Sequence, residues 1–360
     1  MTDPERTDWP AVILAVGAGV AGAFQVGKAP IALPLIRAEL GLDLAAAAWV
    51  LSTLALLGAL APSLPLLLAS RAVEGIGLLV VVIAAPALIA QLTRPEDRNT
   101  AFGLWGCFMP TGMALAMLAA PLLPLAGWRG LWWAMAALLA GYGLAVHRRM
   151  PHPPGHAAAG GGHLLRDLAH TAVSPGPALL AAIFFTYTAA YMALTGFLPT
   201  LLIERLGISP GLAGVMTAAV AGANVIGSLA SGPLLRRGVR RWQPMIAASG
   251  IIGLAALGIF NAATPPVLAY GLCLAFSAFG GLLPGCVLGG AAFYAPERRL
   301  VPVTLGLIMQ GSNLGQVLGP VMVGATVGAL GWGAAALVLA PLSALGIGLA
   351  LALRRVGRPA

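Results

Sequence analysis

Two ionisable side chains, Arg71 and Glu74, lie three positions apart in the apolar run LLASRAVEGIGLL. On a helix this spacing puts both on one face, where they can reach each other. An ionisable group inside a lipid-spanning segment costs about 2.5 to 3.5 kcal/mol on insertion scales, so we expect a partner or a function. One interpretation is a self-neutralising pair near the membrane edge. The other is a glutamate that exchanges a proton beside an arginine that tunes its pKa or binds substrate.

Lys28 is the single lysine of the chain and lies well inside the first apolar run, three positions after Gln25. Its side chain either extends toward the nearer membrane surface or lines a polar cavity beside Gln25, where it would attract an anionic substrate. Both interpretations stay open on the sequence alone.

Further polar side chains lie in apolar runs of the second half. Amides are concentrated in the stretch MQGSNLGQ, where Gln310 and Asn313 share one helix face. Single amides and hydroxyls often only join neighbouring helices, but a concentration of amides is more typical of a polar pathway. The remaining candidates for a substrate or proton pathway are Tyr187, Tyr191 and Asn224 of the second half and Trp105 of the first half, which fits core packing equally well.

Long apolar helices must position these residues. The 360 residues are 59% hydrophobic and only 9% charged, too few polar groups to cover a soluble protein. Runs of about 18 to 25 apolar residues recur, and each is long enough to cross a membrane. We predict an all-α polytopic membrane protein with about eleven transmembrane helices, near residues 11–36, 44–61, 64–92, 99–123, 129–146, 178–203, 210–234, 243–260, 266–293, 301–327 and 332–353.

A stretch rich in Pro, Gly and His separates the fifth predicted helix from the sixth. It cannot bury an apolar face, so we interpret it as a cytoplasmic linker. The predicted domains are a five-helix bundle (1–146), the linker (147–177) and a six-helix bundle (178–360). The linker histidines could hold a metal, but a solvated linker is favoured, and we expect no metal and no cofactor.

The two halves share landmarks in the same order. ALPLIRAELGLDL in the first half resembles FLPTLLIERLGISP in the second, and a Gly-Trp pair follows later in each. Corresponding prolines are 61 positions apart in the first half (Pro34, Pro95) and 97 apart in the second (Pro199, Pro296), a deficit of 36. A helix with its loop is about that long. We infer a duplicated six-helix unit whose first copy lacks its third helix and the preceding loop.

These features resemble the major facilitator superfamily of secondary transporters over essentially the whole chain. The stretches that carry the resemblance are ALPLIRAELGLDLAAAAWVLST, SLPLLLASRAVEGIG, GPLLRRGVRR and GQVLGP. The resemblance implies two bundles that rock around a midplane site. It also implies a coupling role for the arginine at position 71. The second-half copy of the family's signature loop would be a gating loop, with residues Gly232, Arg236, Arg237, Arg240 and Arg241.

The main functional expectation is proton-coupled efflux of a small organic molecule. Uptake of an organic anion is an alternative, and a shortened paralogue without transport is another, because the first-half signature loop is missing. HExxH, GxSxG and GxxxxGK[ST] motifs are absent from the sequence, so we expect a transporter and no enzyme.

The net charge of +9 comes from arginines clustered at the ends of apolar runs, and no basic face interleaved with aromatics is present. We therefore expect a membrane topology signal and no binding of nucleic acid. This bias of arginines toward one side predicts a cytoplasmic carboxyl terminus. We also expect a protein of the bacterial inner membrane that is surrounded by lipids and acts as a monomer. Eleven crossings would then put the amino terminus outside. The alternative, an amino terminus inside, would require the 44–61 segment to re-enter without crossing.

Overall fold

The computed structural model describes residues 6–40, 104–150 and 164–356, together with 81, 82, 85, 88, 89, 92–94, 97 and 101. All regular structure among these residues is helical, as predicted. Eight helical segments of the described part are long and apolar enough to cross a membrane. The contacts divide the chain into two compact units, and the division passes through three of the long helices.

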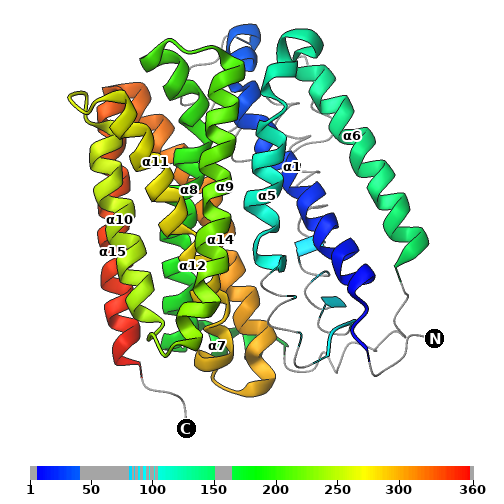
Figure 1. Cartoon of the computed structure of the whole chain (residues 1–360). Helices are drawn as coiled ribbons and strands as arrows, with labels where there is room; N and C mark the ends of the chain where they lie inside the picture. The colour runs from blue at the N-terminus through cyan, green and yellow to red at the C-terminus, as the bar shows by residue number, and fades with distance from the viewer. Residues whose placement is uncertain are drawn as a thin grey trace. The chain divides into compact units, whose positions relative to one another are not determined.

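The first unit contains Met1–Pro151 with the shorter stretches Leu194–Val225 and Val327–Ala329. Its helices α1, α5 and α6 run side by side (Figure 1), and α1 packs on both of the others. Their bounds are Trp9–Leu40 for α1, Phe108–Met117 for α5, Ala120–Leu122 for the 3-10 turn η2, and Leu123–Arg149 for α6.

The start of α1 is tied to the turn that follows Leu92. The Asp8 carboxylate accepts a hydrogen bond from the Ala11 N–H at 3.0 Å, and so caps the helix. The Asp8 N–H donates to the Leu92 carbonyl at 3.1 Å, and the Thr7 hydroxyl donates to Asp97 at 2.6 Å. The start of α1 and the turn around Asp97 therefore lie at the same end of the first unit.

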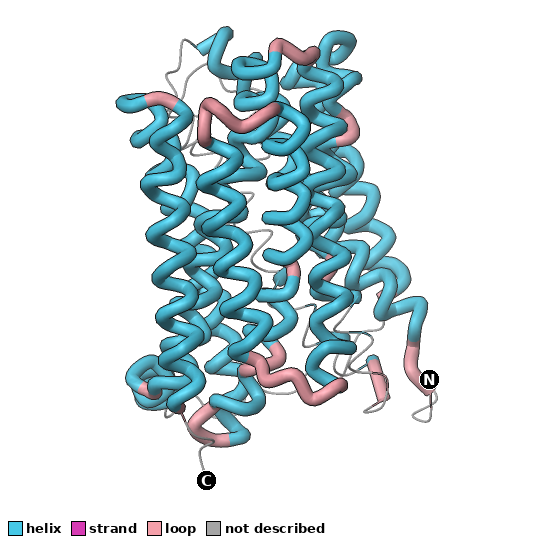
Figure 2. The backbone as a smooth tube through the Cα atoms, turned by 60° about the vertical axis from the view of Figure 1, so that its left-hand side comes forward, coloured by secondary structure: helices cyan, strands magenta, loops and turns pink. Residues whose placement is uncertain are grey.

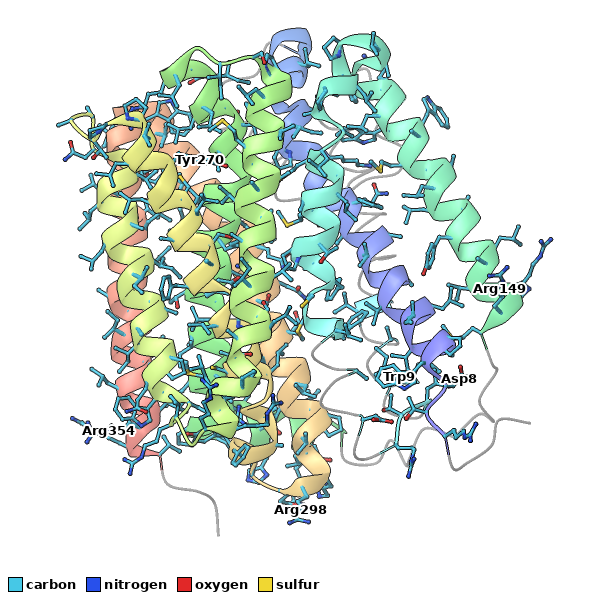
Figure 3. All side chains as sticks on the ribbon, viewed as in Figure 1. Asp8, Trp9, Arg149, Tyr270, Arg298 and Arg354 are labelled. Atoms are coloured by element: carbon cyan, nitrogen blue, oxygen red, sulfur yellow. The ribbon has the colours of Figure 1, made fainter. Side chains whose placement is uncertain are left out.

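One sequence-based prediction does not fit this arrangement. Three crossings between Trp9 and Leu92 would leave these residues at opposite ends, but hydrogen bonds join the two segments. The end of α6 lies there too, as Asp8, Trp9 and Arg149 show in Figure 3. Arginines mark this end, and the side of the membrane on which it lies stays a prediction.

The second unit contains His152–Ala193, Ile226–Thr326 and Leu330–Ala360. Each apolar run predicted after residue 177 forms helix, and the helices lie lengthwise beside one another (Figures 1 and 2). The run predicted as one helix over 266–293 is interrupted at Gly281 and Gly289. The helices that lie wholly or partly in this unit are α7 (Leu164–Val173), α8 (Pro175–Leu206), α9 (Pro210–Arg236), α10 (Trp242–Phe260), α11 (Pro266–Gly280), α12 (Leu282–Leu288), α13 (Ala291–Tyr294), η3 (Arg298–Leu300), α14 (Val301–Leu330), η4 (Trp332–Ala335) and α15 (Ala336–Arg355).

Glycines at every fourth position of α14 allow α8 to approach closely. A Cβ at Gly311, Gly315 or Gly319 would overlap backbone atoms of α8. The Thr188 hydroxyl of α8 also lies 3.0 Å from the Ser312 carbonyl of α14. Small residues and hydrogen bonds between helices hold transmembrane helices together, because in lipid the hydrophobic effect does not drive the helices to associate.

The short helix α7 is fastened to the same unit by an ion pair. Arg299 donates through Nη1 to both carboxylate oxygens of Asp167 at 2.9 Å, and its Nε contacts Glu297 at 2.6 Å. The Arg299 and Arg354 regions lie at one end of this unit, where Figure 3 labels Arg298 and Arg354. Exposed arginines at this end are the basis for predicting a cytoplasmic carboxyl terminus.

Candidate functional site

Lys28 is completely buried in the first unit, with 0% of its surface exposed. Its ammonium donates a hydrogen bond to the Gln25 side-chain carbonyl, one turn earlier on α1. The same Nζ lies 4.4 Å from the ring centroid of Trp132 on α6. Extension of Lys28 to the membrane surface is therefore not what is observed. The ammonium is held inside the unit, where losing its hydration would be costly without such contacts.

Close helix packing brings α1 near enough for these contacts. A Cβ at Gly27 would lie 2.6 Å from the Met113 carbonyl of α5, and one at Gly112 would overlap the Val20 carbonyl of α1. On the α6 side, the Tyr142 hydroxyl donates to the Leu14 carbonyl at 3.1 Å. These contacts fix α1 against both neighbours and so fix where Lys28 lies.

Sequence reasoning did not single out Trp132. It is 1% exposed and meets Trp128, four positions earlier, edge to face with ring centroids 5.5 Å apart. Trp128 in turn carries the Arg129 guanidinium 4.3 Å above its ring. The repeat of tryptophan at i and i+4 in GWRGLWW was the available signal, but a contact with a lysine about a hundred positions away has no pattern in the sequence.

Among the other predicted residues of this part of the chain, Trp105 lies in the apolar core. It stacks on Phe108 with centroids 4.3 Å apart and belongs to a buried cluster with Val12, Ala15 and Ile89. Of its two interpretations, core packing is favoured. Arg71 and Glu74 lie outside the described residues, so their pairing stays a prediction.

Tyr187 and Tyr191 of α8 come together in the second unit. Their rings stack with centroids 5.6 Å apart, and both are under 5% exposed. The Tyr191 hydroxyl and the Ser277 hydroxyl of α11 are both buried. Gly280 gives Tyr187 room, because a Cβ there would lie 3.1 Å from the tyrosine ring. The two tyrosines thus form a buried aromatic pair with a polar tip.

The predicted amide candidates have different surroundings. Asn224 of α9 is 2% exposed. On α14, Gln310 is exposed and Asn313 is half-buried, whereas the buried Ser312 accepts a hydrogen bond from the Gln316 amide at 3.3 Å. The amide-rich stretch therefore combines an exposed side chain with groups that bond within the helix or to α8, and only part of it fits a shared polar pathway.

In the predicted gating loop, Arg241 is the arginine that contacts residues outside the loop. Its guanidinium donates to the Cys286 carbonyl near the end of α12 at 3.4 Å and lies 4.4 Å above the Phe293 ring. Burial lowers the pKa of Arg241 from its usual value. Gly238 supplies the turn with a φ of 86°. The other members are less enclosed: Gly232 is half-buried, and Arg236, Arg237 and Arg240 are exposed.

Clusters of His, Cys, Asp and Glu suited to a metal ion do not occur among the described residues. The chemistry of the described site is therefore that of a buried cation beside an amide and an aromatic ring. Such a group can bind an anion or hold helices together, and it contains no nucleophile placed for covalent chemistry.

The family model described as Major Facilitator Superfamily matches residues 42–303. The chain therefore belongs to the major facilitator superfamily. It is a multi-pass integral membrane transporter of the secondary type and not an enzyme, as the sequence predicted. No curated protein sequence gave a significant match.

Solved transporters share the fold at low sequence identity. A bacterial homologue of the human lysosomal transporter Spinster, inward-facing and occupied, has a TM-score of 0.72 at 15% identity and covers 98% of this chain and 96% of its own. Its inward-facing, unoccupied structure has a TM-score of 0.68 at 15% identity, with coverage of 96% and 95%. The human organic anion transporter MFSD10 (TETRAN) has a TM-score of 0.62 at 20% identity, with coverage of 94% and 81%.

Proposed function

We propose that the chain is a secondary transporter of small organic anions and that Lys28 binds the acidic group of the substrate. The observation that supports this is a lone lysine, fully buried in an apolar bundle and held by Gln25 and Trp132. Charged groups kept at such depth in membrane proteins mark substrate or ion pathways. Organic anions are also the substrate class named for human MFSD10, which shares the fold.

Lys28 is covered in this conformation, so a substrate has to reach it after the helices have moved. Alternating access supplies such a movement, because bundles in these transporters rock to expose a central site to each side in turn. The glycine contacts between α1 and α5 allow close sliding without bulky side chains in the way. The proposed loop Gly232 to Arg241 gates this transition.

The test uses purified protein in proteoliposomes and a panel of acetate, butyrate and benzoate, each compared with its uncharged amide. We expect uptake or exchange of an acid and not of its amide. Lys28→Met should weaken acid binding roughly 10- to 100-fold, the value of a lost charge-assisted hydrogen bond. Lys28→Arg, which keeps the charge, should retain part of the affinity for the acid. Equal handling of acids and amides, or no effect of Lys28→Met, would reject the proposal.

Proton-coupled efflux is the second candidate, favoured by the spacing of Arg71 and Glu74 in the sequence. A carboxylate beside an arginine can exchange a proton when the neighbouring charge changes. We expect an imposed pH gradient to drive transport, and Glu74→Gln to abolish this drive while substrate exchange persists. Gradient-driven transport that is indifferent to Glu74→Gln would reject this coupling. A shortened, inactive paralogue would show no transport of any substrate.

We also propose that both termini face the cytoplasm of a bacterial inner membrane. In each unit the arginine-rich end contains the terminus, by the positive-inside rule. The transporter would act as a monomer among lipids, with a small organic molecule and protons as its partners.

A further inference from the structure

Trp132 provides the aromatic face against which the Lys28 ammonium lies. The distance from Nζ to the ring centroid is 4.4 Å, and the two side chains are 1% exposed or less. Gln25 contacts the same ammonium from within α1. Groups on two helices therefore contact this cation, an amide oxygen on α1 and a π face on α6.

Contact with Trp128 supports the orientation of the Trp132 ring. Trp128 meets it at an interplanar angle of 87°. Edge-to-face contact is a preferred arrangement of aromatic rings. Gly127, with a φ of 62°, breaks α6 directly before Trp128, and this backbone conformation sets the direction in which Trp128 enters the bundle. The backbone turn at Gly127 is thus linked to the Lys28 ammonium through Trp128 and Trp132.

A cation held in a fixed position binds an anionic substrate more tightly than a mobile cation does. Lysine has a long flexible stem and loses much rotamer freedom when a ligand immobilises its ammonium. A ring face attracts the ammonium as a whole and accepts no directed hydrogen bond, so it fixes position without occupying an N–H donor. Affinity gained in this way is preorganisation.

We propose that Trp132 is a positioning residue that determines specificity for anions, because it holds the Lys28 ammonium where the acidic group of the substrate binds. This inference rests on the proposed role of Lys28. An aliphatic side chain at position 132 leaves the charge but removes the π face. We expect Trp132→Leu to weaken binding of an acid about 2- to 30-fold, the range of a cation–π contact, and to leave binding of its amide unchanged.

The contact itself can be measured without transport, because the chain contains one lysine. Protein labelled with ¹³C at lysine Cε gives a single lysine resonance, and a proton above an indole face is shifted upfield by the ring current. We expect this shift in wild type, its persistence in Trp132→Phe and its loss in Trp132→Leu. Trp133 is the matched control, since it is the next residue of α6 and 56% exposed. Trp133→Leu should leave the signal unchanged.

A double-mutant cycle separates positioning from packing. Benzoate and benzamide binding are measured for wild type, Trp132→Leu, Lys28→Met and the double variant. If Trp132 acts through the ammonium, Trp132→Leu weakens benzoate binding when Lys28 is present and has no further effect in the Lys28→Met background. Trp132→Phe should restore most of the affinity. A purely structural role would weaken benzoate binding in both backgrounds.

The outcomes distinguish this inference from the proposed function. A lysine resonance that does not move in Trp132→Leu, or an equal loss of benzoate binding in both backgrounds, would overturn the positioning role while Lys28 could still bind anions. Failure of wild type to bind benzoate, butyrate and acetate would overturn the proposed anion function and, with it, the specificity role.

Discussion

Gly127 and Gly331 share a left-handed backbone conformation, with φ angles of 62° and 82°, and each directly precedes a tryptophan at the start of a helical segment. L-residues with a side chain rarely adopt this conformation. The Gly-Trp pair recognised as a repeated landmark in the sequence is thus repeated in the backbone, once in each unit. This supports an origin by duplication.

Replacing Gly127 or Gly331 by alanine should destabilise the protein, because a residue with a side chain is strained in this backbone conformation. Apart from chain neighbours, no atom of a described residue lies within 4 Å of a Cβ built at Gly127 or Gly331, so the expected loss of about 1 kcal/mol is conformational. Gly143 is the control, because it also has open space but lies in regular helix. Gly143→Ala should be neutral or slightly stabilising. The measurement is the apparent melting temperature in detergent, and equal effects at Gly127 and Gly143 would contradict the explanation.

A second prediction concerns the packing of α8 on α14. A Cβ at Gly315 would lie 2.5 Å from the Phe185 carbonyl and overlap the Thr188 hydroxyl. Gly315→Ala should therefore force the helices apart and cost about 1 to 3 kcal/mol. Gly306, on the same helix and with no neighbour within 4 Å, is the matched control. Gly306→Ala should raise the melting temperature slightly or leave it unchanged; a drop matching that of Gly315→Ala would exclude close packing as the cause.

A third prediction concerns the anchored arginine of the loop. Arg241→Met removes a cation from the carboxyl end of α12 and from the Phe293 ring, and should cost about 1 kcal/mol. In a variant that keeps Cys286 as its one cysteine, maleimide labelling of this buried thiol should become faster. Arg240→Met, at an exposed neighbour, should label like the parent. If both substitutions speed labelling equally, Arg241 is not the anchor.

The side of the amino terminus gives a fourth prediction. The start of α1 is hydrogen-bonded to the turn around Asp97, at the end where α6 also finishes. Reporter domains that fluoresce only in the cytoplasm should therefore be active when fused to either terminus. A reporter domain active only outside the cytoplasm, and active when fused to the amino terminus, would restore the topology first predicted from the number of apolar runs.

Apolar length alone predicted the helices of the second half well: the run expected over 243–260 is α10, Trp242–Phe260. The break of the 266–293 run at Gly281 was not foreseen, although the pair Gly280-Gly281 is a turn signal in the sequence. The hydrogen bond between Asp8 and Leu92 was not foreseen either, because it is a tertiary contact and the acidic segment before Trp9 has little topological signal.

For the candidate site, sequence reasoning found the buried cation and its amide neighbour, because Gln25 and Lys28 are one helical turn apart and unusual in an apolar run. It could not choose between surface extension and burial of Lys28, since both fit the same pattern. Trp132 was missed because its contact depends on how α6 packs on α1. Local spacing predicts neighbours on one helix, and contacts between helices need the fold.

The central claim is that the buried charge at position 28 selects acidic substrates. The most direct measurement is exchange of radiolabelled acetate, butyrate and benzoate across proteoliposomes containing wild type, Lys28→Arg or Lys28→Met, with the matching amides as uncharged references. We predict acid exchange by wild type, partial exchange by Lys28→Arg and little by Lys28→Met. Acid exchange by Lys28→Met at the wild-type rate, or exchange of acid and amide alike by wild type, would contradict it.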